Sequence, residues 1–218
     1  MNWDWNYARQ VFPEIVGNGL LVTIEATVLG SILAYVLGLG LALLRRSPVR
    51  IVSGLAWAFI EIIRSTPLIV QVFFAFFVLP DIGLKFDALT TGVIVIGLHY
   101  ATYTAEVYRA GIEAVPPGQW EAAKALSLPR ARTWLAVILP QAIPRVLPAL
   151  GNYSISLLKE TPILLTIGVL DIVGAAYQAG SRAFRYPEPI TIAGVLFLVL
   201  SYSASLLVRR LERRVATH

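Results

Sequence analysis

The chain has 218 residues, of which 57% are hydrophobic and 14% are charged, and its formal net charge is +5. Soluble domains carry about 25% charged residues. This composition, together with a mean hydropathy of +0.71, excludes a soluble domain with one anchor and indicates an integral membrane protein. The basic residues stand at the ends of apolar runs and form no single patch, which argues against nucleic acid as a partner. The absence of cysteine excludes disulfides and thiolate metal sites.

Five apolar runs are long enough to cross the hydrocarbon core of a membrane, which takes about 20 helical residues. In chain order they cover residues 17–44, 51–79, 88–108, 146–176 and 189–208. The sequence thus predicts an all-α polytopic membrane protein with about five transmembrane helices, residues 1–218 forming one domain. The first residues lack a basic stretch and a small-residue cleavage site, so we expect no removable signal peptide.

Basic residues predict the orientation, because they accumulate on the cytoplasmic side of membrane proteins. The segments after the first, third and fifth runs together hold 12 basic residues, whereas the segments on the opposite side hold 4. We therefore expect an external N-terminus, a cytoplasmic C-terminus and a cytoplasmic location for residues 116–140.

Residues 116–140 form a basic, amphipathic segment between two apolar runs. Val115-Pro-Pro-Gly118 is expected to end the third span, since proline removes a backbone donor and glycine permits a tight turn. Residues 121–126 favour a helix, Pro129 is expected to stop it, and residues 130–139 can form a second short helix before Pro140. The helix dipole favours Glu121 near the helix start. Residue types alone leave open an ordinary cytoplasmic loop with an interfacial helix.

Charged side chains inside the apolar runs are costly and need a structural or functional reason. Glu61 and Arg64 lie one helical turn apart and can pair. Pro67 leaves the backbone carbonyl four residues earlier without its helical hydrogen bond. The proline of Lys159-Glu-Thr-Pro162 is expected to have the same effect. Broken helices with charges near the membrane midplane are typical of transport pathways, but the same residues could be buried pairs that hold helices together.

His99, Tyr103 and Glu106 follow one another at helical spacing in the third run, where they either line a pathway or pack in the interior. The carboxylates are dispersed and no second histidine accompanies them, so the sequence predicts no metal site. It shows no Ser/His/Asp set either, so we do not expect an enzyme. The pathway candidates are therefore Glu61, Arg64, Thr66, His99, Tyr103, Glu106, Lys159 and Glu160.

The spacing of residues 121–140 resembles the EAA loop of ABC import permeases, in which Glu-Ala-Ala precedes a glycine and then Ile-x-Leu-Pro. Glu121, Ala122, Ala123, Leu139 and Pro140 match, whereas Ser127 stands in place of the glycine and Val137 in place of the isoleucine. Because serine tolerates a turn, we expect this difference to be accommodated. Further stretches resemble the permease subunit of polar amino acid ABC importers of the histidine/glutamine type: Leu20-Leu-Val-Thr-Ile24, Arg64-Ser-Thr-Pro-Leu68, Tyr103-Thr-Ala-Glu-Val-Tyr-Arg-Ala-Gly111 and Leu139-Pro-Gln-Ala-Ile-Pro144.

This resemblance implies a transport subunit of the bacterial inner membrane that works with partners. These are a sister permease in a homo- or heterodimer, an ABC ATPase dimer and an extracytoplasmic substrate-binding protein. ATP and magnesium belong to the ATPase, and this chain binds no cofactor; it lacks a Gly-x-x-x-x-Gly-Lys-Ser/Thr phosphate loop. The resemblance makes the Glu121 segment a coupling helix, with Gly118, Glu121, Ala122, Ala123, Ser127, Leu139 and Pro140 as the coupling residues.

Within that family the chain is most similar to ectoine/hydroxyectoine permeases, through Leu98-His-Tyr-Ala-Thr-Tyr-Thr104 and Pro148-Ala-Leu-Gly-Asn-Tyr153. A zwitterion needs a cation for its carboxylate, an acceptor for its positive group and an apolar or aromatic wall. Arg64 or Lys159, Glu61 or Glu106, and Tyr103 could provide them. The alternatives are arginine, glutamate or glutamine as substrate, a secondary transporter driven by an ion gradient, and a membrane scaffold or membrane-embedded enzyme.

Overall fold

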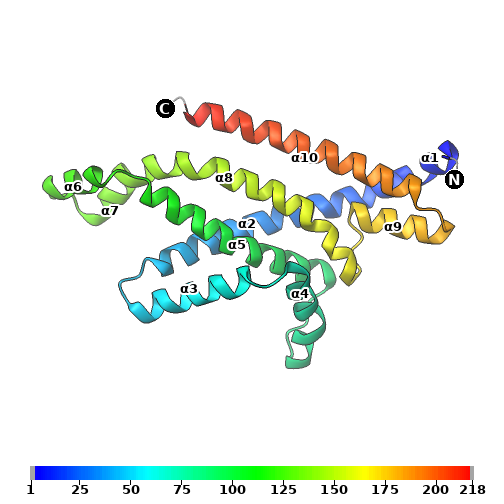
Figure 1. Ribbon diagram of the computed structural model, residues 1–218, viewed down its shortest axis with the longest axis horizontal. Coiled ribbons are helices and arrows are strands. Elements are labelled where there is room, and N and C mark those ends of the chain that lie inside the picture. The colour runs from blue at the N-terminus through cyan, green and yellow to red at the C-terminus, as the bar shows by residue number, and fades with distance from the viewer. Residues whose placement is uncertain (1–2, 217–218) are drawn as a thin grey trace.

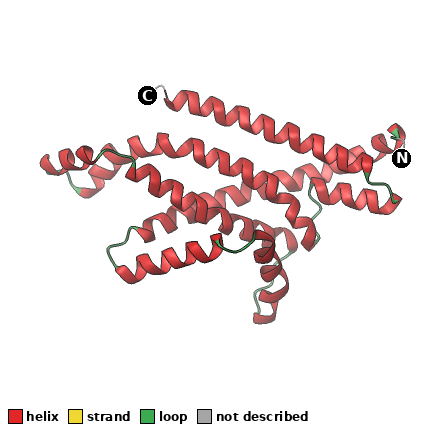
Figure 2. Cartoon of the chain, viewed as in Figure 1, coloured by secondary structure: helices red, strands yellow, loops and turns green. Residues whose placement is uncertain are grey.

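The computed structural model describes residues 3–216, and within that range all regular elements are helices (Figures 1 and 2). The predicted all-α class is confirmed for these residues; the predicted domain, 1–218, extends two residues beyond them at each end. The α-helices are α1 (Trp5–Glu14), α2 (Leu20–Arg45), α3 (Arg50–Arg64), α4 (Leu68–Phe73), α5 (Ala88–Glu113), α6 (Pro117–Ala125), α7 (Arg130–Arg132), α8 (Leu139–Glu160), α9 (Ile172–Ala183) and α10 (Pro187–Ala216).

The first span is longer than the apolar run that predicted it. A single π-helical turn, Ile15–Gly19, joins α1 to α2, so that the helix is continuous over 41 residues, Trp5–Arg45. Its start is fixed by Asp4, whose carboxylate accepts hydrogen bonds from the backbone N–H groups of Asn6 and Tyr7 at 2.9 and 3.2 Å. Such a cap satisfies donors that have no partner inside the helix.

The second run, 51–79, is two helices rather than one. α3 ends at Arg64, and α4 leaves it at an angle of 103°. Pro67 sits at the corner as the N-cap of α4, because proline cannot continue the hydrogen-bonded ladder of α3. Figure 1 shows α4 turned away from the long helices, which run roughly alongside one another.

The fourth run, 146–176, is also not one helix. The helix begins at Arg130 and passes through Pro140 to Ile167, the last turns being a 3₁₀-helix, Thr161–Ile167. Gly168 then adopts a left-handed φ of 86°, and α9 begins afresh at Ile172, capped by Asp171. The short helix expected to end before Pro140 therefore continues. A wider π-helical segment, Thr133–Ile138, ends two residues before Pro140, where it relieves the clash of the proline ring with the preceding turn.

Within residues 3–216, three helices are long and apolar enough to cross a membrane: Trp5–Arg45, Arg130–Ile167 and Pro187–Arg213. The bent pair Arg50–Arg64 and Leu68–Ile82 can count as a fourth. α5 is long enough but less apolar, and it packs mainly against α2 at the centre of the bundle. The expected number of five spans, and the orientation, therefore stay predictions.

A row of small residues on α2 allows α5 to approach closely. Every fourth residue of α2 between positions 26 and 42 is small and buried: Ala26, Gly30, Ala34, Gly38 and Ala42. Small residues at helical spacing are typical of helix pairs that pack tightly in membranes. At the closest point the Thr104 hydroxyl of α5 donates a 2.8 Å hydrogen bond to the Ala34 carbonyl.

We expect Gly38→Ala to destabilise the protein, whereas Gly40→Ala should not. A Cβ at Gly38 would lie 2.0 Å from the Thr104 hydroxyl oxygen and 2.9 Å from the Ala101 carbonyl oxygen, but at Gly40 it would meet nothing within 4 Å. Overpacking of this kind costs about 1–3 kcal/mol. Thermal unfolding in detergent measures the difference, and equal midpoints for the two variants would contradict this view of the α2–α5 contact.

Candidate functional site

The corner between α3 and α4 is held by Gln71. The Gln71 Nε2 group donates hydrogen bonds to the carbonyl oxygens of Ile63 and Thr66, at 2.7 and 3.1 Å, and to the Thr66 hydroxyl at 2.8 Å. Ile63 is the residue whose carbonyl Pro67 frees from the helix ladder. Backbone groups freed inside a membrane must find such partners, so Gln71 allows the break to exist at membrane depth.

Aromatic side chains gather beside this corner. The Gln71 Oε1 atom lies 3.1 Å from His99 Nδ1 on α5. The His99 ring is 5.3 Å from the Tyr103 ring, and Tyr153 of α8 lies 5.7 Å from Tyr103 and 6.1 Å from Tyr100. Two helices far apart in sequence, α5 and α8, thus contribute to what we call the aromatic cluster: His99, Tyr100, Tyr103 and Tyr153.

Arg64 places a positive charge over the aromatic cluster. Its guanidinium carbon is 5.2 Å from the centre of the Tyr103 ring, a distance typical of a cation–π contact. Glu61 lies 3.9 Å from Arg64, and both side chains remain more than one-third exposed. The pair is therefore loose and accessible, rather than a buried bridge between helices.

The remaining pathway candidates divide among three places. Thr66 lies at the corner and accepts a hydrogen bond from Gln71, whereas Lys159 and Glu160 lie exposed at the end of α8. Glu160 is close enough to Tyr100 to interact electrostatically with it. Glu106 instead forms ion pairs with Arg45 of α2 and with Arg109, the latter at 2.8 Å. Glu106 is thus paired with arginines other than Arg64.

Three residues of this region were not among the pathway candidates of the sequence analysis: Gln71, Tyr100 and Tyr153. Gln71 is the one polar residue in the stretch 68–79, and it lies four residues after Pro67. That spacing is the signal that could have found it. The two tyrosines carried no such signal, because their contribution depends on how α5 and α8 pack.

The helix α6 lies at one end of the molecule, on the side where the α2–α3 loop also lies (Figure 1). Glu121, Ala122, Lys124 and Ala125 are exposed, but Ala123 is buried against the chain itself. Two expectations need correction. Gly118 is a helical residue of α6 and makes no turn, and Glu121 is the fifth residue of the helix, beyond the first turn where the dipole acts.

Ser127 ends α6 in a left-handed conformation with a φ of 52°. The Leu128 N–H donates to the Ala123 carbonyl at 3.0 Å, and the Ser127 N–H donates to the Lys124 carbonyl at 2.9 Å. This pair of bonds is the Schellman motif, whose left-handed position is usually glycine. The expected turn therefore forms, although a serine occupies the strained position.

We expect Ser127→Gly to stabilise the protein by about 0.5–1 kcal/mol, because glycine relieves the left-handed strain. Ser127→Ala keeps a Cβ and removes the hydroxyl, so it should give no gain. Thermal unfolding in detergent compares the two variants. A lower midpoint for Ser127→Gly than for the wild type would contradict this assignment.

Aromatic contacts brace α6 against the bundle. Trp120 of α6 packs edge-on against Trp134, with ring centres 5.2 Å apart. The Arg46 guanidinium, just after α2, lies 5.6 Å from the Trp134 ring centre. Gln119 of α6 also accepts a 3.2 Å hydrogen bond from Gln141 of α8. These contacts connect α6 to the ends of α2 and α8.

A family model described as "binding-protein-dependent transport system inner membrane component" matches residues 19–217. A protein of Sinorhizobium fredii, named as a probable amino-acid ABC transporter permease, is 46% identical over 95% of this chain and 90% of its own length. The arginine transport system permease of Bacillus subtilis is 34% identical over the whole of both chains. The L-cystine transport system permease of the same organism is 35% identical over 97% of this chain and 93% of its own.

Solved structures agree with these relatives. A chain from the crystal structure of an amino acid ABC transporter with histidines superposes with a TM-score of 0.92 at 37% identity, covering 98% of this chain and 100% of its own. A chain from an inward-facing methionine ABC transporter superposes with a TM-score of 0.77 at 22% identity, covering 92% and 96%. The second likeness speaks for the fold alone.

Proposed function

Because the chain belongs to the family of inner membrane components of binding-protein-dependent transport systems, we propose that it is the permease subunit of an ATP-driven importer of a small zwitterionic solute. The observation that carries this proposal is the exposed helix α6, with Glu121 and Ala122 facing outward at one end of the bundle. A helix offered in this way is a docking surface for a soluble partner, and the family description implies one.

We propose that α6 docks on the ATPase on the cytoplasmic side. ATP-driven closure of the ATPase pair would displace α6, and the Trp120–Trp134 contact and the Gln119–Gln141 hydrogen bond would pass the displacement to α2 and α8. The aromatic cluster involves α5 and α8, so its accessibility would alternate between the two sides of the membrane. The ATP chemistry is assigned to the partner chain.

We place the solute at the aromatic cluster and Arg64. The Arg64 guanidinium is exposed enough to donate hydrogen bonds to a carboxylate, and the tyrosine faces suit the positive end of a zwitterion. Glu61 and Glu160 supply acceptors near the two ends of this region. Glu106, held by two arginines, is assigned to the contact between α2 and α5 instead.

The identity of the solute rests on two different supports. The sequence stretches around His99 and Tyr153 favour ectoine and hydroxyectoine, whereas the curated relatives include permeases named for arginine and L-cystine. An amino acid and ectoine share the carboxylate and the positive group that the aromatic cluster and Arg64 would bind. We propose ectoine as the first substrate to test and arginine, glutamate and glutamine as its rivals.

Uptake into proteoliposomes distinguishes these substrates. The vesicles contain this chain, its sister permease, the ATPase and the cognate binding protein, and they receive labelled ectoine, arginine, glutamate or glutamine. Ectoine uptake that unlabelled hydroxyectoine blocks would establish the proposed substrate. Uptake of an amino acid alone would keep the importer and discard ectoine. A verified complex that takes up none of them would overturn the proposed function.

A further inference from the structure

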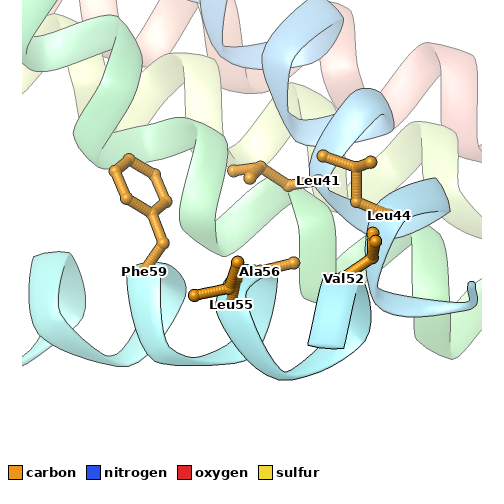
Figure 3. A pocket seen from close by; sticks show the side chains of 6 residues that line it. All are labelled: Leu41, Leu44, Val52, Leu55, Ala56 and Phe59. Carbon is orange, nitrogen blue, oxygen red and sulfur yellow. The ribbon is translucent and has the colours of Figure 1, made fainter. Parts of the chain in front are cut away.

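An apolar groove of about 400 Å³ runs between α2 and α3 near the end of the molecule where α6 lies (Figure 3). Its walls are hydrocarbon side chains from the two helices, which in Figure 3 line the space between α2 and α3. They are Leu41, Leu44, Val52, Leu55, Ala56 and Phe59. Both helices are expected membrane elements, so this groove faces lipid rather than water.

The groove ends at a polar rim formed by the α2–α3 loop. A hollow of about 820 Å³ shares Leu44 with the groove and is lined in addition by Arg46, Ser47 and Trp134. A second hollow, of about 390 Å³, shares Ser47 with the first and is lined by Arg45, Arg50 and Trp57. Apolar walls thus lead to three arginines and two tryptophans, which are residues typical of the membrane–water interface.

Two of these arginines are not neutralised by the protein. Arg45 is paired with Glu106. Arg46 lies against the face of Trp134, and Arg50 is exposed. Among residues 3–216, no carboxylate forms an ion pair with Arg46 or Arg50. The N-cap of α3, Val49, makes no side-chain cap, so the first N–H groups of α3, which begins at Arg50 of this rim, receive no side-chain acceptor from it.

We propose that this groove and rim bind one anionic glycerophospholipid. An acyl chain lies between Leu41 and Leu55, and the phosphate receives hydrogen bonds from Arg46, Arg50 and the start of α3. Charge complementarity decides the occupant, because a second apolar protein surface would fill the groove but leave both arginines without an anion. The lipid site does not involve the transported solute. A failure of the lipid proposal would therefore leave the proposed substrate unaffected, and the reverse also holds.

Photo-crosslinking tests the proposal on the full-length chain in nanodiscs. Phosphatidylglycerol with a photoactivatable group on its acyl chain is compared with phosphatidylcholine carrying the same group, and the labelled peptides are identified by mass spectrometry. We expect phosphatidylglycerol to label residues 41–59 preferentially. The double variant Arg46→Gln/Arg50→Gln should reduce that labelling about tenfold or more, since each arginine near the surface contributes to binding anionic lipid.

A matched variant separates a specific site from general surface charge. Arg209→Gln/Arg210→Gln removes the same charge from exposed positions near the end of α10, and it should leave the labelling of residues 41–59 unchanged. Equal labelling by the two lipids would overturn the proposal, as would an equal loss in both double variants. Crosslinks that join two copies of the chain through residues 41–59 would show that protein occupies the groove and would overturn it too.

Discussion

Glu121→Arg is expected to abolish ATPase docking and, with it, transport. Glu121 is exposed on α6 next to Ala122, which allows close approach of a partner surface. Reversing its charge would place like charges at the contact with a cationic partner residue. Loss of a buried interfacial charge pair costs about 2–5 kcal/mol, which weakens binding by about thirtyfold or more. Co-purification of the ATPase with the tagged permease measures the effect.

The control for this prediction is Asp81→Arg. Asp81 is an exposed carboxylate on the short 3₁₀-helix that follows α4, away from α6. The substitution changes the net charge by the same amount and should leave ATPase binding intact. If Glu121→Arg retained the ATPase as well as Asp81→Arg does, α6 would not be the docking helix.

Arg64→Ala and Lys159→Ala are each expected to abolish uptake while leaving the complex assembled. Arg64 lies over Tyr103 and is partly exposed, and Lys159 is exposed at the end of α8 with no ion pair among the described residues. Hydrogen bonds to a charged group contribute about 1.5–3 kcal/mol, so losing one should lower uptake at least about tenfold. Uptake into proteoliposomes at low solute concentration is the measurement.

Lys85→Ala serves as the matched control, because Lys85 is an exposed cation in the loop between α4 and α5. It should transport normally. Unchanged uptake in both Arg64→Ala and Lys159→Ala would remove the proposed carboxylate site. A loss in Arg64→Ala alone would assign the carboxylate to Arg64, which the structure places at the aromatic cluster.

The apolar runs predicted the helical class, because an apolar stretch of about 20 residues is the length that a helix needs to cross a membrane. They did not predict where helices break. The break at Pro67 was visible as a proline, but its angle of 103° depends on Gln71 satisfying freed backbone groups. Pro140 shows the opposite outcome, since a π-helical segment absorbs it and the helix continues.

Spacing predicted neighbours on one helix better than partners on different helices. Arg64 and Glu61 were expected to pair, and they lie 3.9 Å apart. Glu106 was grouped with His99 and Tyr103 because the three share a face of α5, but its carboxylate forms an ion pair with Arg45 of α2. No periodicity within one helix contains that information, because it arises when α2 and α5 pack through small residues such as Gly38.

The requirement for ATP tests the central claim most directly. Proteoliposomes containing the four components are loaded with ATP, with a non-hydrolysable analogue or with no nucleotide, and each condition is measured once with intact ion gradients and once with the gradients collapsed by ionophores. We predict solute uptake only with hydrolysable ATP, whether or not the gradients are collapsed, and loss of this uptake in Glu121→Arg vesicles. Uptake that needs no ATPase but disappears when the ion gradients are collapsed would contradict it and identify a secondary transporter.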